Sequence, residues 1–140
     1  MIGKINHIAI VVPDLLAASE RWRDVLGAEV GPLKTLKEHG VRVAFVRSEN
    51  SQVELMEPFG EKSPLSKFLN RNPKGGLHHI CYEVEDVEKA KASLEASGIE
   101  ILGDSGVVIG AHGKPVLFIH PSDFHGTLIE LEQALPNEKN

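Results

Sequence analysis

Two histidines and two glutamates recur in the same order along this chain, and they offer nitrogen and oxygen ligands for a metal ion. The stretch around His79 repeats the stretch around His7 at an offset of 72 (79 − 7). Glu130 and Glu54 lie in a second pair of matching stretches at an offset of 76 (130 − 54). Self-similarity at a nearly constant offset indicates two copies of one module. Each copy therefore contributes one histidine and one glutamate.

A divalent cation is the chemistry that this set of side chains favours. Two carboxylates brought together raise each other's pKa, because their like charges repel and because burial disfavours the ionised form of each. A bound cation removes that cost. A mixed nitrogen and oxygen ligand set suits Co²⁺, Mn²⁺, Ni²⁺, Zn²⁺ or Fe²⁺, and a six-coordinate ion would keep two positions for substrate oxygens. One such histidine or glutamate alone is usually structural, but repeat-related positions favour a metal site with four ligands, namely His7, Glu54, His79 and Glu130.

The elements that must position these side chains follow the pattern strand, helix, strand, strand, strand in each module. Residues 5–12 are rich in β-branched side chains and predict a buried strand, after which Asp14 is suited to cap a helix that Gly27 ends. The polar residues 135–140 are expected to be frayed. The same signals predict further strands at 28–36, 41–47, 52–56, 77–84, 99–102, 115–120 and 127–132, and helices at 15–26, at 87–97 and from Ser63-Pro64.

Sheets of this size do not cover themselves, so the two βαβββ modules are expected to combine. The prediction is an α+β fold in which both modules pair into one curved eight-stranded mixed sheet around a metal cavity, with the helices outside. We expect one domain over residues 1–140, with module one at about 4–57, a linker at 58–76 and module two at about 77–133.

Alternation along each strand separates the predicted ligands from the core. His79 is expected to face the cavity, whereas the adjacent His78 must point to the other face. The apolar neighbours of Glu54 and Glu130 are expected to pack under the helices and to leave both carboxylates on the cavity side. These neighbours are Val53, Leu55, Ile129 and Leu131.

Charge and cysteine content narrow the classes of function. The net charge is −5 with scattered charges, which argues against binding to nucleic acid or to a membrane surface. Cys81 is the only cysteine, so a reducing compartment is expected. The start of the chain resembles no signal peptide, and no apolar run reaches membrane-spanning length. We therefore predict a cytoplasmic protein.

Five stretches of the sequence resemble the vicinal oxygen chelate superfamily and, within it, the methylmalonyl-CoA epimerases. The likeness covers nearly the whole chain. Its most specific part is Gly-Ala-His-Gly-Lys-Pro at 110–115, whereas the spaced histidines and glutamates are shared with glyoxalase I. The five stretches are 6–9, 38–43, 75–84, 109–121 and 128–133.

The resemblance implies an isomerase that interconverts (R)- and (S)-methylmalonyl-CoA by proton transfer at the α-carbon through a metal-stabilised enolate. The metal ligands of the family match the four residues named above, although some epimerases have glutamine in place of Glu54. The resemblance makes Glu130 the first candidate for the base. Glu54 is then the candidate for proton transfer on the opposite face of the α-carbon. One departure stands out: a proposed acid/base glutamate of certain epimerases aligns near Val43, which cannot transfer a proton.

The Gly-rich loop that contains His112, Gly113 and Lys114 is a candidate for substrate binding, and an exposed turn with solvated side chains is the alternative. By resemblance, an acyl-CoA thioester is the expected substrate, propionate metabolism the expected setting, and a homodimer the expected assembly. A glyoxalase I type isomerase and a metal-free binding protein of the same fold remain the alternative functions.

Overall fold

A computed structural model describes residues 1–136, so the expected frayed end at 135–140 lies mostly outside the described part. The chain divides into two compact units. The first unit spans residues 7–78, and the second combines residues 1–6 with the described residues 79–136.

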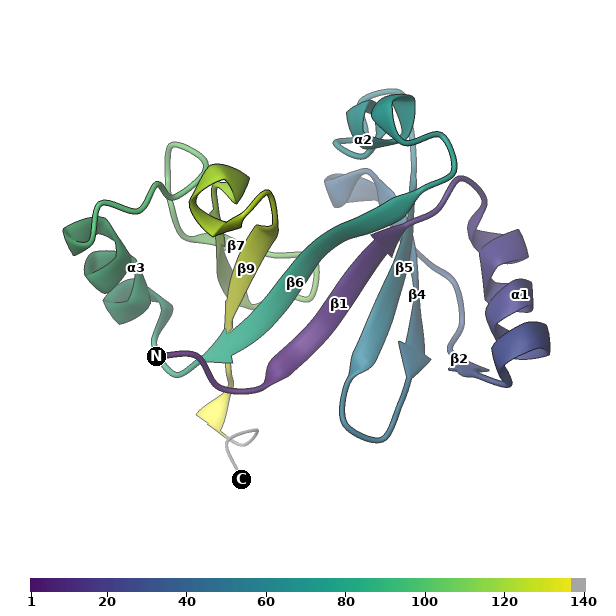
Figure 1. Cartoon of the computed structure of the whole chain (residues 1–140), viewed down its shortest axis with the longest axis horizontal. Helices are drawn as coiled ribbons and strands as arrows, with labels where there is room; N and C mark the ends of the chain where they lie inside the picture. The colour runs from purple at the N-terminus through teal and green to yellow at the C-terminus, as the bar shows by residue number, and fades with distance from the viewer. Residues whose placement is uncertain (137–140) are drawn as a thin grey trace. The chain divides into compact units, whose positions relative to one another are not determined.

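The first unit consists of a mixed sheet and two helices (Figure 1). Its strands lie in the order β2-β4-β5-β1, and β3 pairs with residues 41–43 of β4, which β2 does not reach. The β1 and β5 strands are parallel, whereas β4 is antiparallel to its partners. The elements are β1 (Ile5–Val11), α1 (Leu15–Leu26), β2 (Glu29–Val30), β3 (Lys34–Leu36), the 3-10 turn η1 (Lys37–His39), β4 (Val41–Arg47), β5 (Gln52–Pro58) and α2 (Ser66–Arg71).

The second unit repeats this scheme in the strand order β6-β9-β8-β7. Its β6 and β9 strands are parallel, and β8 is antiparallel to β9 and β7. In each unit a parallel strand pair, β1–β5 or β6–β9, continues into an antiparallel pair, β5–β4 or β9–β8. This mixed pairing confirms the predicted α+β class. The elements are β6 (Gly76–Val84), α3 (Val87–Ala96), β7 (Val108–Ile109), β8 (Pro115–Ile119), the 3-10 turn η2 (Pro121–Phe124) and β9 (Leu128–Gln133).

The first helix of each unit begins in the same way. The Oδ1 atoms of Asp14 and Asp86 accept hydrogen bonds of 3.0 Å from backbone amides of the first turn, as the sequence predicts for N-caps. In each unit a side chain near the end of the strand β5 or β9 also accepts a hydrogen bond from the backbone amide of the first helical residue. The two accepting residues, Glu57 and Gln133, are related by the repeat (133 − 57 = 76). These contacts join Leu15 N to Glu57 Oε2 at 3.4 Å and Val87 N to Gln133 Oε1 at 3.0 Å.

One face of each sheet packs under a helix, because alternate strand residues on that face are apolar. The helix α1 contacts β2, β4 and β5, and α3 contacts β8 and β9. The predicted inward neighbours of both glutamates lie in these cores, so this part of the prediction is confirmed. The cluster under α1 includes Val12, Leu15, Val46, Val53 and Leu55, and the cluster under α3 includes Val84, Val87, Leu117, Ile129 and Leu131.

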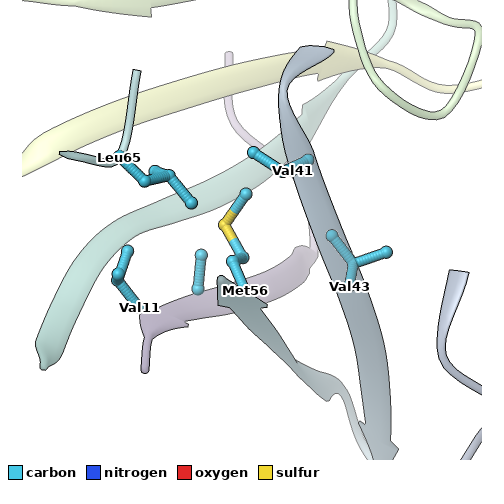
Figure 2. Close-up of a cluster of buried hydrophobic side chains, with 6 residues drawn as sticks. Val11, Val41, Val43, Met56 and Leu65 are labelled. Atoms are coloured by element: carbon cyan, nitrogen blue, oxygen red, sulfur yellow. The ribbon is translucent and has the colours of Figure 1, made fainter. Parts of the chain in front are cut away.

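The opposite face of the first unit carries a second apolar cluster. Figure 2 shows side chains from β1, β4, β5 and the segment before α2 pointing toward one another. Val43 lies in this cluster and is only 1% exposed. The members are Ala9, Val11, Val41, Val43, Met56 and Leu65.

Three predicted elements need correction. The segment 99–102 is no strand: it makes a single bridge, Ile101 to Ile119, and Gly103 then turns the chain away with a φ of 82°. The helix expected from Ser63-Pro64 begins at Ser66, because the preceding residues form a turn in which the Ser63 hydroxyl accepts from Leu65 N at 3.3 Å. The described residues form nine strands rather than eight, since residues 28–36 split into two strands and β7 was not anticipated.

We expect Gly75→Ala to destabilise the protein far more than Gly27→Ala. Both glycines have left-handed backbones, with φ of 84° and 63°. A Cβ on Gly75 would lie 2.3 Å from the Val11 carbonyl oxygen, whereas a Cβ on Gly27 meets nothing within 4 Å. The left-handed conformation alone costs roughly 1–2 kcal/mol, and the clash raises the loss at Gly75 to roughly 2–5 kcal/mol. Urea unfolding of both variants measures this difference, and equal losses would contradict it.

Candidate metal and substrate site

The first unit brings His7 and Glu54 together on its parallel strands β1 and β5. The Nε2 atom of His7 lies 3.6 Å from Oε1 of Glu54, and the two side chains are 0% and 3% exposed. Phe45, which faces Glu54 across the β4–β5 pair, packs against the imidazole with the two ring centroids 6.4 Å apart and the planes at 85°. The histidine therefore contacts both a carboxylate and an aromatic ring.

The second unit repeats this arrangement with His79 on β6 and Glu130 on β9. The Nε2 atom of His79 lies 3.2 Å from Oε2 of Glu130, and the side chains are 5% and 8% exposed. Phe118 faces Glu130 across the β8–β9 pair and packs against His79 with the ring centroids 6.1 Å apart and the planes at 88°. Each unit therefore holds one buried imidazole, one buried carboxylate and one phenyl ring in matching places.

The geometry of both pairs fits ligands of a metal ion. Metal bonds of about 2.0–2.2 Å at angles of about 90–110° separate two ligand atoms by about 2.8–3.6 Å. The observed separations of 3.6 Å and 3.2 Å fall at or near this range. An ionised carboxylate is costly to bury beside a neutral imidazole, because the imidazole does not cancel its charge. Buried histidine and glutamate side chains of the described residues are accordingly placed to hold a metal ion.

The Gly-rich loop at 110–114 is a tight hairpin turn between β7 and β8. Gly110 N donates to Lys114 O at 2.9 Å, and Gly113 N donates to Gly110 O at 3.0 Å. Gly113 has a φ of 77°, a left-handed value that favours glycine. His112 and Lys114 therefore flank the left-handed glycine of this turn.

The side chains of this turn point back onto strand β9. His112 Nδ1 lies 3.4 Å from Oε1 of Glu132, and Lys114 Nζ lies 3.9 Å from Oε2 of the same residue. The side chains of His112 and Lys114 are 25% and 19% exposed. They are mostly buried and paired, rather than solvated as the exposed-turn alternative requires.

Reasoning from the sequence did not single out Phe45, Phe118 or Glu132. The two phenylalanines lie directly opposite the glutamates on neighbouring strands, so a correct β4–β5 and β8–β9 register would have revealed them. Glu132 follows Glu130 by two residues, so strand alternation alone places it on the same face. His78, predicted to be no ligand, packs its ring against Phe68 with the centroids 5.3 Å apart.

A comparison with protein families identifies the relatives of this chain. The model of the glyoxalase/bleomycin resistance protein/dioxygenase superfamily matches residues 6–118. The chain belongs to this superfamily. Among the described residues, this superfamily member has no helix that is long and apolar enough to cross a membrane.

Its similar proteins within the superfamily include several epimerases. An ethylmalonyl-CoA/methylmalonyl-CoA epimerase of Cereibacter sphaeroides is 55% identical over 96% of this chain and 100% of its own length. The mitochondrial methylmalonyl-CoA epimerase of Mus musculus is 50% identical over 95% of this chain and 74% of its own length. A solved structure of a Streptomyces coelicolor methylmalonyl-CoA epimerase variant, in complex with 2-nitronate-propionyl-CoA, matches with a TM-score of 0.85 and 33% identity over 100% of both chains.

These similarities confirm two predictions made from the sequence. The resemblance to methylmalonyl-CoA epimerases is confirmed, because these two curated epimerases are 55% and 50% identical to this chain over the aligned residues. The fold class is confirmed over the whole chain, because the solved epimerase covers all of it.

Proposed function

We propose that this member of the glyoxalase superfamily is an isomerase that epimerises methylmalonyl-CoA at its α-carbon. The observation that carries the proposal is the matched pair of buried histidine and glutamate in each unit, on a chain that shares more than half of its residues with an ethylmalonyl-CoA/methylmalonyl-CoA epimerase. The substrate is then an acyl-CoA thioester with a free carboxylate next to the reacting carbon.

The two pairs are proposed to hold one divalent ion, Co²⁺, Mn²⁺, Ni²⁺ or Zn²⁺, through four ligands. When bound, such an ion supplies Lewis-acid stabilisation of the negative charge that develops on the thioester oxygen as the α-proton leaves. Phe45 and Phe118 support the site by restricting the orientation of the imidazoles. The four ligands are His7, Glu54, His79 and Glu130.

Epimerisation removes a proton from one face of the α-carbon and returns a proton to the other face, so it is best served by two groups. We assign proton transfer on one face to Glu130 and on the opposite face to Glu54, which occupy equivalent places in the two units. The alternative position near Val43 offers no acid or base, because valine has an aliphatic side chain, and this one belongs to an apolar cluster. The two glutamates are thus the available acid/base pair among the residues assigned to the site.

The turn that contains His112, Gly113 and Lys114 is proposed to contact the substrate. Lys114 carries the positive charge that a substrate carboxylate requires, and its side chain lies beside β9, the strand of Glu130. Gly113 keeps the turn tight enough to place both neighbours over the same strand.

We further propose a cytoplasmic homodimer. A single cysteine, fully buried at position 81, suits a reducing compartment. The assembly follows from family resemblance, and sedimentation equilibrium of the purified protein tests it directly. A monomer at micromolar concentration would contradict the proposed assembly.

Deuterium exchange at C2 of methylmalonyl-CoA in D₂O tests the function. We expect rapid exchange with the metal-loaded protein, a fall of at least about a thousandfold after chelation and dialysis, and recovery when one equivalent of Co²⁺ is added. The hemithioacetal of methylglyoxal and glutathione serves as the comparison substrate. Turnover of the hemithioacetal without C2 exchange would favour a glyoxalase I type isomerase, and tight ligand binding without either reaction would favour a binding protein.

A further inference from the structure

Glu132 is a buried acid that the proposed ligand set does not use. It is 2% exposed, although glutamate is almost never fully buried unless it is paired. The equivalent position in the first unit is Met56 (132 − 56 = 76), which belongs to the apolar cluster of Figure 2. In the corresponding register, Val43 faces Met56 and Val116 faces Glu132. The repeat therefore accepts an apolar side chain at this place, and the carboxylate serves a purpose that is specific to the second unit.

The partners of Glu132 indicate that purpose. Each carboxylate oxygen lies near a different side chain of the 110–114 turn: Oε1 is 3.4 Å from His112 Nδ1, and Oε2 is 3.9 Å from Lys114 Nζ. A strand residue thus holds both polar side chains of a hairpin turn at once. Both contacts reach across the sheet rather than along the turn, so they determine where the turn side chains lie relative to β9.

We propose that Glu132 is a positioning residue, which holds Lys114 so that the lysine binds the free carboxylate of the acyl-CoA substrate. The inference rests on the function proposed above. An ammonium group has three N–H donors, so one lysine can donate to Glu132 and to a substrate carboxylate at the same time. A free lysine side chain has about 2 kcal/mol of rotamer entropy to lose, and a lysine that is already held loses less of it on binding. His112 is held by Oε1 of Glu132, so the carboxylate also restrains the part of the turn that precedes Gly113.

Glu132→Gln is the direct test, because it keeps the shape of the side chain and removes its charge. We expect the KM for methylmalonyl-CoA to rise about tenfold, as for a lost charge-assisted contact, with a smaller change in kcat. The dissociation constant of propionyl-CoA, which has the same thioester without the carboxylate, should stay within about twofold. Metal content, measured after dialysis, should remain that of the parent protein.

Lys114→Gln and the double variant show whether Glu132 acts through the lysine. If it does, Lys114→Gln raises the KM at least as much as Glu132→Gln, and the double variant is no worse than Lys114→Gln alone. If the increase in KM of the double variant equals the product of the two single increases, the proposal is overturned.

Two controls separate positioning from a general loss of structure. Glu95→Gln removes an exposed carboxylate that pairs with Lys91 in the same unit, and it should leave the KM unchanged. Glu132→Met places the residue of the first unit at the equivalent position, and we expect it to fold and to raise the KM as Glu132→Gln does. It replaces Glu132→Gln in the comparison if the glutamine variant does not fold.

An unchanged KM in the folded variants, or an equal loss of affinity for propionyl-CoA, would overturn the positioning role while leaving the function intact. Absence of chelator-sensitive C2 exchange in the parent protein would instead overturn the proposed function and this inference with it.

Discussion

Replacement of Glu130 with alanine is expected to abolish both metal binding and epimerisation. Glu130 is 6% exposed, and its carboxylate lies 3.2 Å from the His79 imidazole. The variant loses a ligand and the proposed base together, and C2 exchange should fall at least about a thousandfold. Metal analysis after dialysis and the exchange assay measure the two losses separately.

The variant Glu130→Gln separates the role of Glu130 as a metal ligand from its role as the base. An amide oxygen remains a weak ligand, so part of the metal should stay bound, but the amide cannot accept the α-proton. Glu95→Ala, an exposed acid of the same unit, serves as the matched control and should retain metal and activity. A metal-replete and fully active Glu130→Ala protein would remove this residue from the mechanism.

Glu54→Gln is expected to uncouple exchange from epimerisation. Glutamine stands at this position in some of the epimerases that the sequence resembles, so we expect the metal to remain bound. Because Val43 offers no acid or base, Glu54 is the proposed proton carrier on its face, and epimerisation should fall roughly 100- to 10,000-fold. Glu130 is untouched, so one stereoisomer should still exchange its C2 proton.

Stereochemically pure substrates resolve this outcome. Each isomer is incubated in D₂O with Glu54→Gln, and proton NMR follows loss of the C2 proton and appearance of the opposite isomer. Exchange confined to one isomer supports the two-base assignment. Unimpaired epimerisation by the metal-replete variant would show that Glu54 is a ligand only.

Much of the fold follows from local signals. Asp14 and Asp86 cap their helices where a short polar side chain precedes an apolar helical pattern. Alternation of apolar and polar residues sorted the two faces of the strands around Glu54 and Glu130 correctly, since a strand residue reaches only one face. Local propensity failed at 99–102, because a strand exists only where a partner supplies its hydrogen bonds, and that segment meets β8 at a single bridge.

The sequence by itself determined the duplicated module, the helix caps and the four candidate ligands, because repeats and alternation are properties of the chain order. Which side chains support those ligands was decided only by the tertiary structure. Phe45 and Phe118 reach the histidines through the strand register, and Glu132 meets the turn of Lys114 across 18 residues of chain (132 − 114). Such contacts depend on which strands become neighbours, and hydrogen bonding across the whole sheet selects those neighbours.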